Sequence, residues 1–193
     1  MMIQKTFPKF KNPNLYKPGD ILIPADRINI RLQELAAEVA KKYSGLDLMI
    51  IGVLKGAFML TADFSRALNK AGLLKFSLDF ITVSSYLSGT NSSGTLKITG
   101  DTDIDPRGKH VLLLDDIIDS TLSLSTIHKI EKDKGAVSVS SLALLSKPER
   151  YQSEYRPDFV GFEIPNVWVQ GFGMDTDQLG RENPNIIVGP FSP

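Results

Sequence analysis

Short apolar runs that alternate with amphipathic segments set the strongest limit on how this chain can fold. The runs span residues 46–54, 110–114 and 137–145, and segments with helical periodicity span 26–43, 57–70 and 120–134. A short apolar run is typical of a strand that is buried on both faces, as strands are in a parallel sheet covered by helices. The alternation therefore predicts an α/β fold with a twisted, mostly parallel sheet flanked by helices.

Local signals place the ends of these elements. Asp26 stands where the first helix is expected to begin, so it is a candidate N-cap. Gly72 and Gly135 follow the second and third helical segments, where a helix commonly stops. Further strands are expected at 74–83, at 95–100 and, toward the C-terminus, within 157–165, 166–172 and 185–190.

The chain is expected to form a single domain, because 193 residues is the usual size of one. Residues 1–20 carry four lysines and three prolines and predict an irregular N-terminal arm. Residues 84–101 begin with a Ser/Gly/Thr-rich stretch and predict a mobile loop. No apolar run reaches the roughly 18 residues of a membrane span, and residues 1–20 lack the apolar core of a signal peptide. We therefore expect a cytoplasmic protein with no membrane partner.

Composition excludes several kinds of site. The chain has 22 Lys and Arg against 22 Asp and Glu, so no general attraction to nucleic acid is expected. It has no cysteine and only two histidines, which excludes disulfides, iron–sulfur clusters, cysteine nucleophiles and zinc sites built from thiolates or several histidines. A metal ion would have to be a hard cation held by oxygen ligands.

Residues 111–123 are the segment with the clearest chemistry. An apolar run leads into three carboxylates and then into hydroxyl residues at the start of the expected helix: Asp115, Asp116, Asp119, Ser120, Thr121 and Ser123. Carboxylates suit sugar hydroxyls or a hydrated divalent cation, and the N-terminus of a helix suits a phosphate. A sugar phosphate would bind both groups, with its hydroxyls at the carboxylates and its phosphate at the helix N-terminus. The same residues also fit a solvated acidic strand end followed by an Asp or Ser N-cap.

This segment resembles the phosphoribosyl-pyrophosphate signature of the type I phosphoribosyltransferases. From about Ile21 to Val188 the chain is similar to the hypoxanthine-guanine branch of that superfamily. Further matching motifs are 53–56 (VLKG), Ser85-Tyr86, Lys147 and 157–165 (PDFVGFEIP). The resemblance implies a type I phosphoribosyltransferase fold, with a small hood made by the N-terminal arm and about 166–193.

The resemblance also implies a reaction. A 6-oxopurine (hypoxanthine, guanine or xanthine) would take the phosphoribosyl group from phosphoribosyl pyrophosphate, with Mg²⁺ as cofactor, giving IMP or GMP and pyrophosphate. Asp119 would be the catalytic residue, placed near purine N7 as a general base or as a stabiliser of developing charge. The active form would be a homodimer or homotetramer.

Individual binding roles follow from the same resemblance. The ribose hydroxyls would bind Asp115 and Asp116, and the 5′-phosphate would bind Asp119, Ser120, Thr121, Leu122 and Ser123. Pyrophosphate would bind Leu54, Lys55, Gly56 and Arg181, with a cis peptide expected at Leu54–Lys55. The purine would contact Lys147, Trp168, Val169 and Asp175, and Mg²⁺ would bind Asp115, Asp116 and Asp175. Ser85 and Tyr86 would begin the mobile loop that closes over the site. Taken alone, Lys147 would be a solvated charge and Trp168 a core residue.

Two residues depart from the family pattern. Thr121 stands where a glycine is usual, and Val167 where relatives often carry lysine. A left-handed backbone is costly for a β-branched residue, so we expect ordinary helical or extended angles at Thr121. The substitution keeps an alternative function open: a non-catalytic protein of the same fold that binds phosphoribosyl pyrophosphate or a nucleotide as a regulator.

Overall fold

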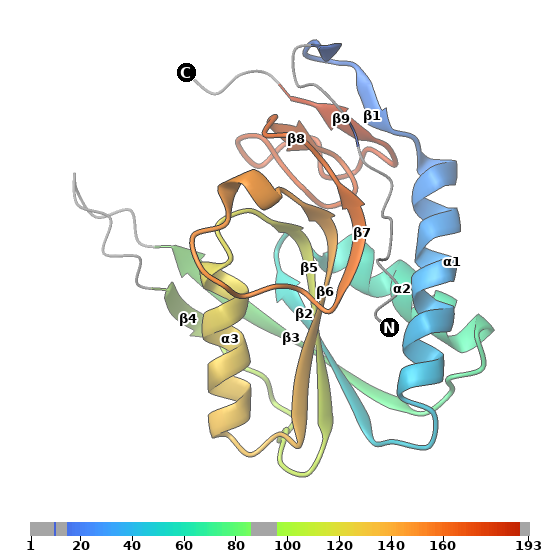
Figure 1. The fold of residues 1–193 in the computed structure, drawn as a ribbon, viewed down its shortest axis with the longest axis vertical. Coiled ribbons are helices and arrows are strands. Elements are labelled where there is room, and N and C mark those ends of the chain that lie inside the picture. The colour runs from blue at the N-terminus through green and yellow to red at the C-terminus, as the bar shows by residue number, and fades with distance from the viewer. Residues whose placement is uncertain (1–9, 11–14, 86–95, 190–193) are drawn as a thin grey trace.

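A six-stranded sheet forms the centre of the molecule in the computed structural model, which describes residues 10, 15–85 and 96–189 (Figure 1). Its strand order is β4-β3-β2-β5-β6-β7. All neighbouring strands run parallel except β3 and β4, which are antiparallel. The strands are β2 (Leu48–Leu54), β3 (Phe76–Ser85), β4 (Leu96–Gly100), β5 (His110–Ile118), β6 (Ser138–Ser146) and β7 (Phe159–Glu163). The predicted α/β class with a mostly parallel sheet is confirmed.

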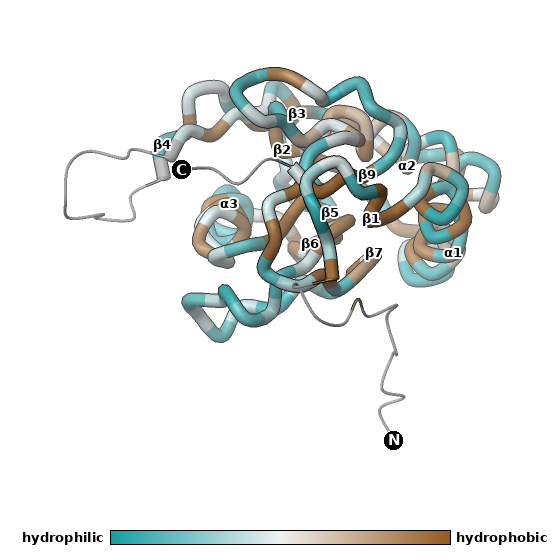
Figure 2. The backbone as a smooth tube through the Cα atoms, turned by 90° about the horizontal axis from the view of Figure 1, so that it is seen from above, coloured by the Kyte–Doolittle hydropathy of each residue, from teal (hydrophilic) through white to brown (hydrophobic). Residues whose placement is uncertain are grey.

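Helices cover both faces of this sheet (Figure 2). Helices α1 (Ala25–Lys42) and α2 (Phe58–Lys70) pack on one face, and α3 (Leu122–Asp133) packs on the other. Side chains along β2 alternate between the two resulting hydrophobic clusters, with Leu48 and Ile50 in one and Met49 and Ile51 in the other. Burial on both faces explains why the strand is an unbroken apolar run in the sequence.

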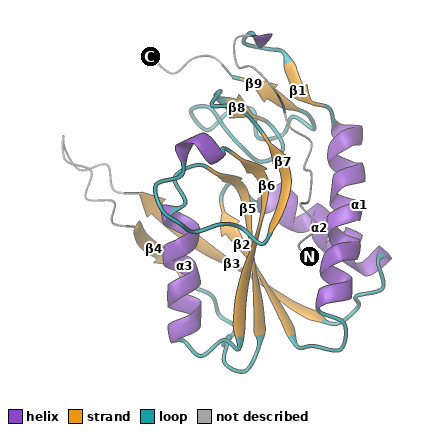
Figure 3. Cartoon of the chain, in the orientation of Figure 1, coloured by secondary structure: helices purple, strands orange, loops and turns teal. Residues whose placement is uncertain are grey.

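A small three-stranded sheet forms the hood, which lies above the carboxyl ends of the parallel strands (Figure 3). It consists of β1 (Ile21–Ile23), β9 (Ile186–Val188) and β8 (Val169–Gln170), paired antiparallel in that order. The hood therefore joins the beginning of the described chain to its end. It brings residues from 169–189 over the edge of the sheet where ligands of α/β proteins usually bind.

The first helix begins differently from the prediction. Helix α1 starts at Ala25 with Pro24 at the N-cap position, so the expectation of an Asp26 cap is wrong. The Ala25 backbone N–H instead donates to Asn185 Oδ1 at 2.9 Å, and Asn185 belongs to the hood region. A distant side chain thus supplies the cap, and Asp26 lies in the first turn, where its charge suits the helix dipole.

Strand β5 is four residues longer than predicted. It continues to Ile118 because β6 runs beside it, pairing Asp115 with Ala143 and Ile118 with Ser146. Asp115 and Asp116 are therefore inside the strand and not beyond its end. Helix α3 in turn begins at Leu122, two residues later than predicted.

The predicted mobile loop at 84–101 is also partly regular. Strand β3 extends to Ser85, and the strand expected at 95–100 is confirmed as β4, which lies beside it. The intervening residues 86–95, including Tyr86, lie outside the described residues. Across the described part of the chain, no helix combines the length and apolarity needed to cross a membrane.

Candidate active site

A cavity of about 520 Å³ lies below the hood, at the carboxyl ends of β2, β3 and β5. Ten of the residues singled out in the sequence line it: Leu54, Lys55, Gly56, Asp116, Asp119, Lys147, Trp168, Val169, Asp175 and Arg181. They come from widely separated segments, so the fold itself assembles the constellation. Asp115, Ser120, Thr121, Leu122 and Ser123 were also singled out and are not among its lining residues.

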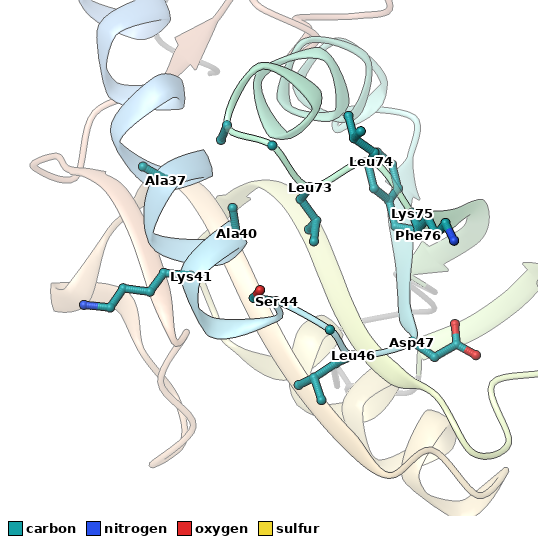
Figure 4. A pocket seen from close by; sticks show the side chains of 13 residues that line it. Ala37, Ala40, Lys41, Ser44, Leu46, Asp47, Leu73, Leu74, Lys75 and Phe76 are labelled. Atoms are coloured by element: carbon teal, nitrogen blue, oxygen red, sulfur yellow. The ribbon is translucent and has the colours of Figure 1, made fainter.

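A larger groove of about 980 Å³ lies elsewhere, between the C-terminal part of α1 and the connection from α2 to β3 (Figure 4). Its side chains include Lys41, Leu46, Leu74 and Lys75, and none of the predicted site residues line it. The smaller cavity is therefore the candidate active site, because ten of the predicted site residues line it and none line the groove.

The turn after β2 packs closely against its neighbours on two sides. Its Leu54–Lys55 peptide bond is cis, as expected. A Cβ on Gly56 would lie 1.9 Å from Asp116 Oδ2, and a Cβ on Gly173 would lie 2.0 Å from the Gly56 carbonyl oxygen. Both positions accept only glycine without rearrangement, and Gly173 also has a φ of 101°. The turn is thus fixed between the β5 carboxylate and the hood.

Two adjacent carboxylates lie beside this turn. Asp116 lines the cavity, whereas Asp115 is only 9% exposed and lies behind it. Burial raises the pKa of Asp115 well above its ordinary value, and the neighbouring Asp116 charge raises it further. Burial also raises the pKa of Asp116, although a hydrogen bond with Asp115 and, to a smaller extent, the Arg181 charge oppose the change. The carboxylate oxygens of Asp115 and Asp116 suit a hydrated Mg²⁺, whose charge would offset their mutual repulsion, although no group of three or more acidic or histidine side chains gathers as a metal site in the described part of the chain.

Asp119 forms ion pairs with two cations. Lys147 Nζ lies 3.6 Å from Asp119 Oδ2, and Arg150 Nε pairs with Asp119 Oδ1. Lys147 is only 6% exposed, so the interpretation of a solvated charge is wrong. Burial lowers the pKa of Lys147, and Asp119 partly restores it. A buried ammonium on the wall of a cavity is a strong hydrogen-bond donor toward a ligand acceptor.

Arg150 was missed in the sequence. It ends a 3-10 turn, η2 (Pro148–Arg150), that follows β6 directly. The turn brings the guanidinium back to Asp119, so the Arg three residues after Lys147 was the available signal.

Trp168 is 45% exposed and lines the cavity, so the core interpretation is wrong. Its Nε1–H donates to Thr176 Oγ1 at 2.8 Å, and Gly189 packs so closely that a Cβ there would lie 2.4 Å from Trp168 Cδ1. The indole is thereby fixed at its pyrrole edge. Its neighbour Val167 is buried in the hydrophobic core, which explains how the chain accommodates an apolar residue at this position.

Asp175 and Arg181 form an ion pair of 2.6 Å on the hood side of the cavity. Asp175 Oδ2 also accepts the Gln178 backbone N–H at 2.8 Å, and Arg181 Nη1 donates to the Gly173 carbonyl at 2.8 Å. Gln178 Oε1 accepts from Lys55 Nζ at 3.4 Å and so connects the hood to the turn after β2. Gln178 was not singled out, because a lone amide in a loop carries no distinctive signal.

The backbone of Thr121 contradicts the expected angles. Its φ is 68° and its ψ is −14°, which is the left-handed region. The side chain is 2% exposed, and its hydroxyl lies 2.7 Å from Ser153 Oγ. The expectation is wrong because tertiary contacts from a distant segment hold a conformation that local preference disfavours.

The strand β3 and its partner contribute residues that were also missed. Thr82, Val83 and Ser84 line the cavity from β3, and Thr99 lines it from β4. Ser85 is the last residue of β3. The sequence predicts a strand over 74–83, a mobile loop from 84 and a further strand at 95–100, but it assigns none of these four side chains to the site.

Comparison with known proteins places the chain in a family. The model of the phosphoribosyl transferase domain matches residues 22–177. The chain is 38% identical to a hypoxanthine-guanine phosphoribosyltransferase of Aquifex aeolicus, over 87% of this chain and 93% of that protein. It is 37% identical to a hypoxanthine phosphoribosyltransferase of Escherichia coli, over 86% and 93%.

Solved structures agree with this assignment. A Trypanosoma cruzi hypoxanthine phosphoribosyltransferase in complex with the product IMP superimposes with a TM-score of 0.83 at 35% identity, covering 91% of this chain and 96% of that one. A Staphylococcus aureus hypoxanthine phosphoribosyltransferase gives a TM-score of 0.81 at 32% identity, covering 89% and 91%. The resemblance found in the sequence is confirmed, and the chain belongs to the phosphoribosyl transferase family.

Proposed function

We propose that this phosphoribosyltransferase transfers the phosphoribosyl group of phosphoribosyl pyrophosphate to hypoxanthine, guanine or xanthine, with Mg²⁺, giving the nucleoside monophosphate and pyrophosphate. The observation that carries the proposal is the position of Lys147. Its buried ammonium lines one cavity together with the exposed indole of Trp168 and lies 3.6 Å from Asp119. One cavity wall therefore offers a donor, an acidic group and an aromatic surface.

The purine would bind between these groups. Trp168 supplies a large rigid apolar face for the ring, since its hydrogen bond to Thr176 fixes its edge. Lys147 Nζ is a donor without acceptor capacity, so it favours the O6 oxygen of a 6-oxopurine over the amino group of adenine. Val169 would hold the base edge through its backbone, and Asp175 would lie near the purine 2-position.

The phosphoribosyl pyrophosphate would lie across the carboxyl ends of β2 and β5. Asp116 would accept hydrogen bonds from the ribose hydroxyls, with Asp115 behind it. Residues 119–123 would receive the 5′-phosphate at the start of α3, where free backbone N–H groups and the helix dipole favour an anion. Leu54, Lys55, Gly56 and Arg181 would contact the pyrophosphate, with Gln178 holding the two cations in place.

Mg²⁺ would bind through Asp115, Asp116 and Asp175. The first two form the desolvated carboxylate pair described above, and both oxygens of Asp175 already have partners, so Asp175 would act through water. When bound, the ion would supply positive charge to the departing pyrophosphate.

Asp119 would act on the base. Its carboxylate would accept the N7 proton or stabilise the charge that develops as the new bond to C1′ forms. Lys147 and Arg150 hold the carboxylate on both sides, so it is positioned before the base binds. The protein's other contribution would be to fix the reactants in line inside a cavity that lies below the hood.

A homodimer or homotetramer remains part of the proposal. In a Trypanosoma cruzi hypoxanthine phosphoribosyl transferase of similar structure, the C-terminal region has a role in the oligomeric state and enzymatic activity. Size-exclusion chromatography with light scattering would give the mass of this protein in solution, and a monomer at every concentration would refute this part.

A spectrophotometric assay of four bases tests the proposal. Hypoxanthine, guanine, xanthine and adenine are each given with phosphoribosyl pyrophosphate and Mg²⁺. We expect turnover of at least one 6-oxopurine and a kcat/KM for adenine at least about 10²-fold lower, because the amino group of adenine would meet the Lys147 ammonium with a donor in place of an acceptor. Equal turnover of adenine would refute the base assignment. If calorimetry shows that phosphoribosyl pyrophosphate binds but no base is turned over, the alternative of a non-catalytic regulator with the same fold would be supported instead.

A further inference from the structure

The connection between β6 and β7 wraps around the segment that precedes α3 (Figure 1). The Lys147 backbone N–H donates to the Ile118 carbonyl at 3.0 Å, and the Gln152 N–H donates to the Ser120 carbonyl at 3.2 Å. One residue further along the connection, Ser153 Oγ lies 2.7 Å from Thr121 Oγ1. Two backbone contacts and one side-chain contact thus fasten residues 118–121 to a segment about thirty positions later.

These hydroxyls form a chain of hydrogen bonds. Thr121 Oγ1 contacts both the Ser120 carbonyl and Ser153 Oγ, and either hydroxyl can be the donor in the second contact. Ser153 Oγ in turn accepts the Tyr155 backbone N–H at 3.2 Å. The chain ends on the carbonyl immediately before the left-handed residue.

This contact compensates for a backbone that threonine disfavours. A glycine adopts a φ of 68° without a partner, whereas an isolated threonine does so only when surrounding structure holds it. The Thr121 side chain is 2% exposed, and its hydroxyl contacts Ser153 in the β6–β7 connection.

We infer that Ser153 is a positioning residue for the 5′-phosphate segment, and that it acts only through Thr121. The pair Thr121–Ser153 replaces the glycine that is usual at this position. The inference deepens the proposed function and rests on it for the identity of the bound phosphate. It also explains how the departure at Thr121 is compatible with a working site, which removes the main reason for the regulator alternative.

A double-mutant experiment separates this role from a purely structural one. The variants are Ser153→Ala, Thr121→Gly and the double variant, and the readouts are the Kd of ribose 5-phosphate by calorimetry, the KM for phosphoribosyl pyrophosphate and kcat. We expect Ser153→Ala to weaken both affinities about three- to tenfold in the native background, the scale of one neutral hydrogen bond, with little change in kcat. In the Thr121→Gly background the same change should have less than about a twofold effect.

Three controls test whether Ser153 acts through Thr121 or has a purely structural role. Ser153 also accepts the Tyr155 N–H, so a structural role through Tyr155 would give equal losses in both backgrounds, and that result would overturn the inference. Thr121→Val keeps the β-branched shape and removes the contact with Ser153 together with the contact to the Ser120 carbonyl. It should weaken both affinities at least as much as Ser153→Ala, and an unchanged affinity would refute the proposal even if Ser153→Ala does not fold. Ser65→Ala, which removes a local helix hydrogen bond far from the site, should leave the affinities unchanged.

The experiment also distinguishes failure of the Ser153 role from failure of the transferase proposal. Ribose 5-phosphate binding that follows the predicted double-mutant pattern, without turnover of any base, would support the Ser153 role and refute the transferase proposal. If the native protein turns over a 6-oxopurine but Ser153→Ala causes equal losses in both backgrounds, the transferase proposal is supported and the Ser153 role is refuted. No binding of ribose 5-phosphate to the native protein would overturn the Ser153 inference itself.

Discussion

Replacing Gly56 with alanine should damage the site without damaging the fold. The added Cβ would lie 1.9 Å from Asp116 Oδ2 and 2.5 Å from its Cγ, whereas ordinary contact begins near 3.4 Å. The Gly56 backbone cannot retreat, because Gly173 packs against its carbonyl on the other side. The Asp116 carboxylate must therefore move by about 1.5 Å, away from the position proposed for the ribose hydroxyls.

The size of the effect follows from the overlap. Forcing an extra methyl group into a packed site costs about 1–3 kcal/mol, which corresponds to about 5- to 150-fold in kcat/KM if it is expressed in substrate binding. Steady-state kinetics with phosphoribosyl pyrophosphate as the varied substrate measures this loss, and circular dichroism checks that the variant is folded.

Gly100→Ala is the matched control. A Cβ at Gly100 would meet Thr82 Oγ1 at 3.4 Å, an ordinary contact, and Thr82 lines the same cavity. We expect Gly100→Ala to keep kcat/KM within about twofold. If Gly56→Ala behaves like Gly100→Ala, the contact between the β2 turn and Asp116 does not support the site and the argument fails.

Three further changes test other parts of the site. Asp119→Asn should stay folded and lower kcat by about 10²-fold or more, the usual effect of removing a positioned acid or base, and wild-type turnover would remove Asp119 from the mechanism. Lys147→Met should lower kcat/KM for hypoxanthine and reduce its preference over adenine by at least about tenfold, as competition between the two bases would show. Burial raises the pKa of Tyr155 to about 12, so the folded state holds that proton more tightly than the unfolded chain, and stability should fall as pH rises from 10 to 12. Discounted for partial exposure, this is roughly 1–2 kcal/mol, and urea unfolding of Tyr155→Phe should show a flatter pH slope in that range, with Tyr151 contributing to the slope that remains.

The sheet could be predicted because burial dictates its sequence. A strand such as β2 is covered on both faces and must be apolar throughout, so residues 46–54 were recognisable without any tertiary information. The ends of elements were less predictable, because distant partners decide them. The β6 strand extends β5 past Asp115 and Asp116, and Asn185 caps α1 in place of Asp26.

In the candidate site, too, some residues could be predicted from the sequence, and those that depend on distant contacts could not. The fold brings Asp116, Lys147 and Trp168 to one cavity. All three residues could be recognised in the sequence from the motifs that contain them. Thr121 was predicted wrongly because its left-handed backbone occurs together with a contact to the distant Ser153, which local preference cannot reveal. Arg150 was missed for the same reason, since its contact with Asp119 exists only after η2 turns back toward the site.

A crystal structure of the complex with inosine 5′-monophosphate would test the central claim most directly. We predict purine O6 within about 2.7–3.2 Å of Lys147 Nζ, the ring stacked on Trp168, and the 5′-phosphate against the backbone N–H groups at the start of α3. A nucleotide bound in the groove between α1 and the α2–β3 connection, or bound in the cavity with its phosphate at Lys55 and its base away from Lys147, would contradict the account.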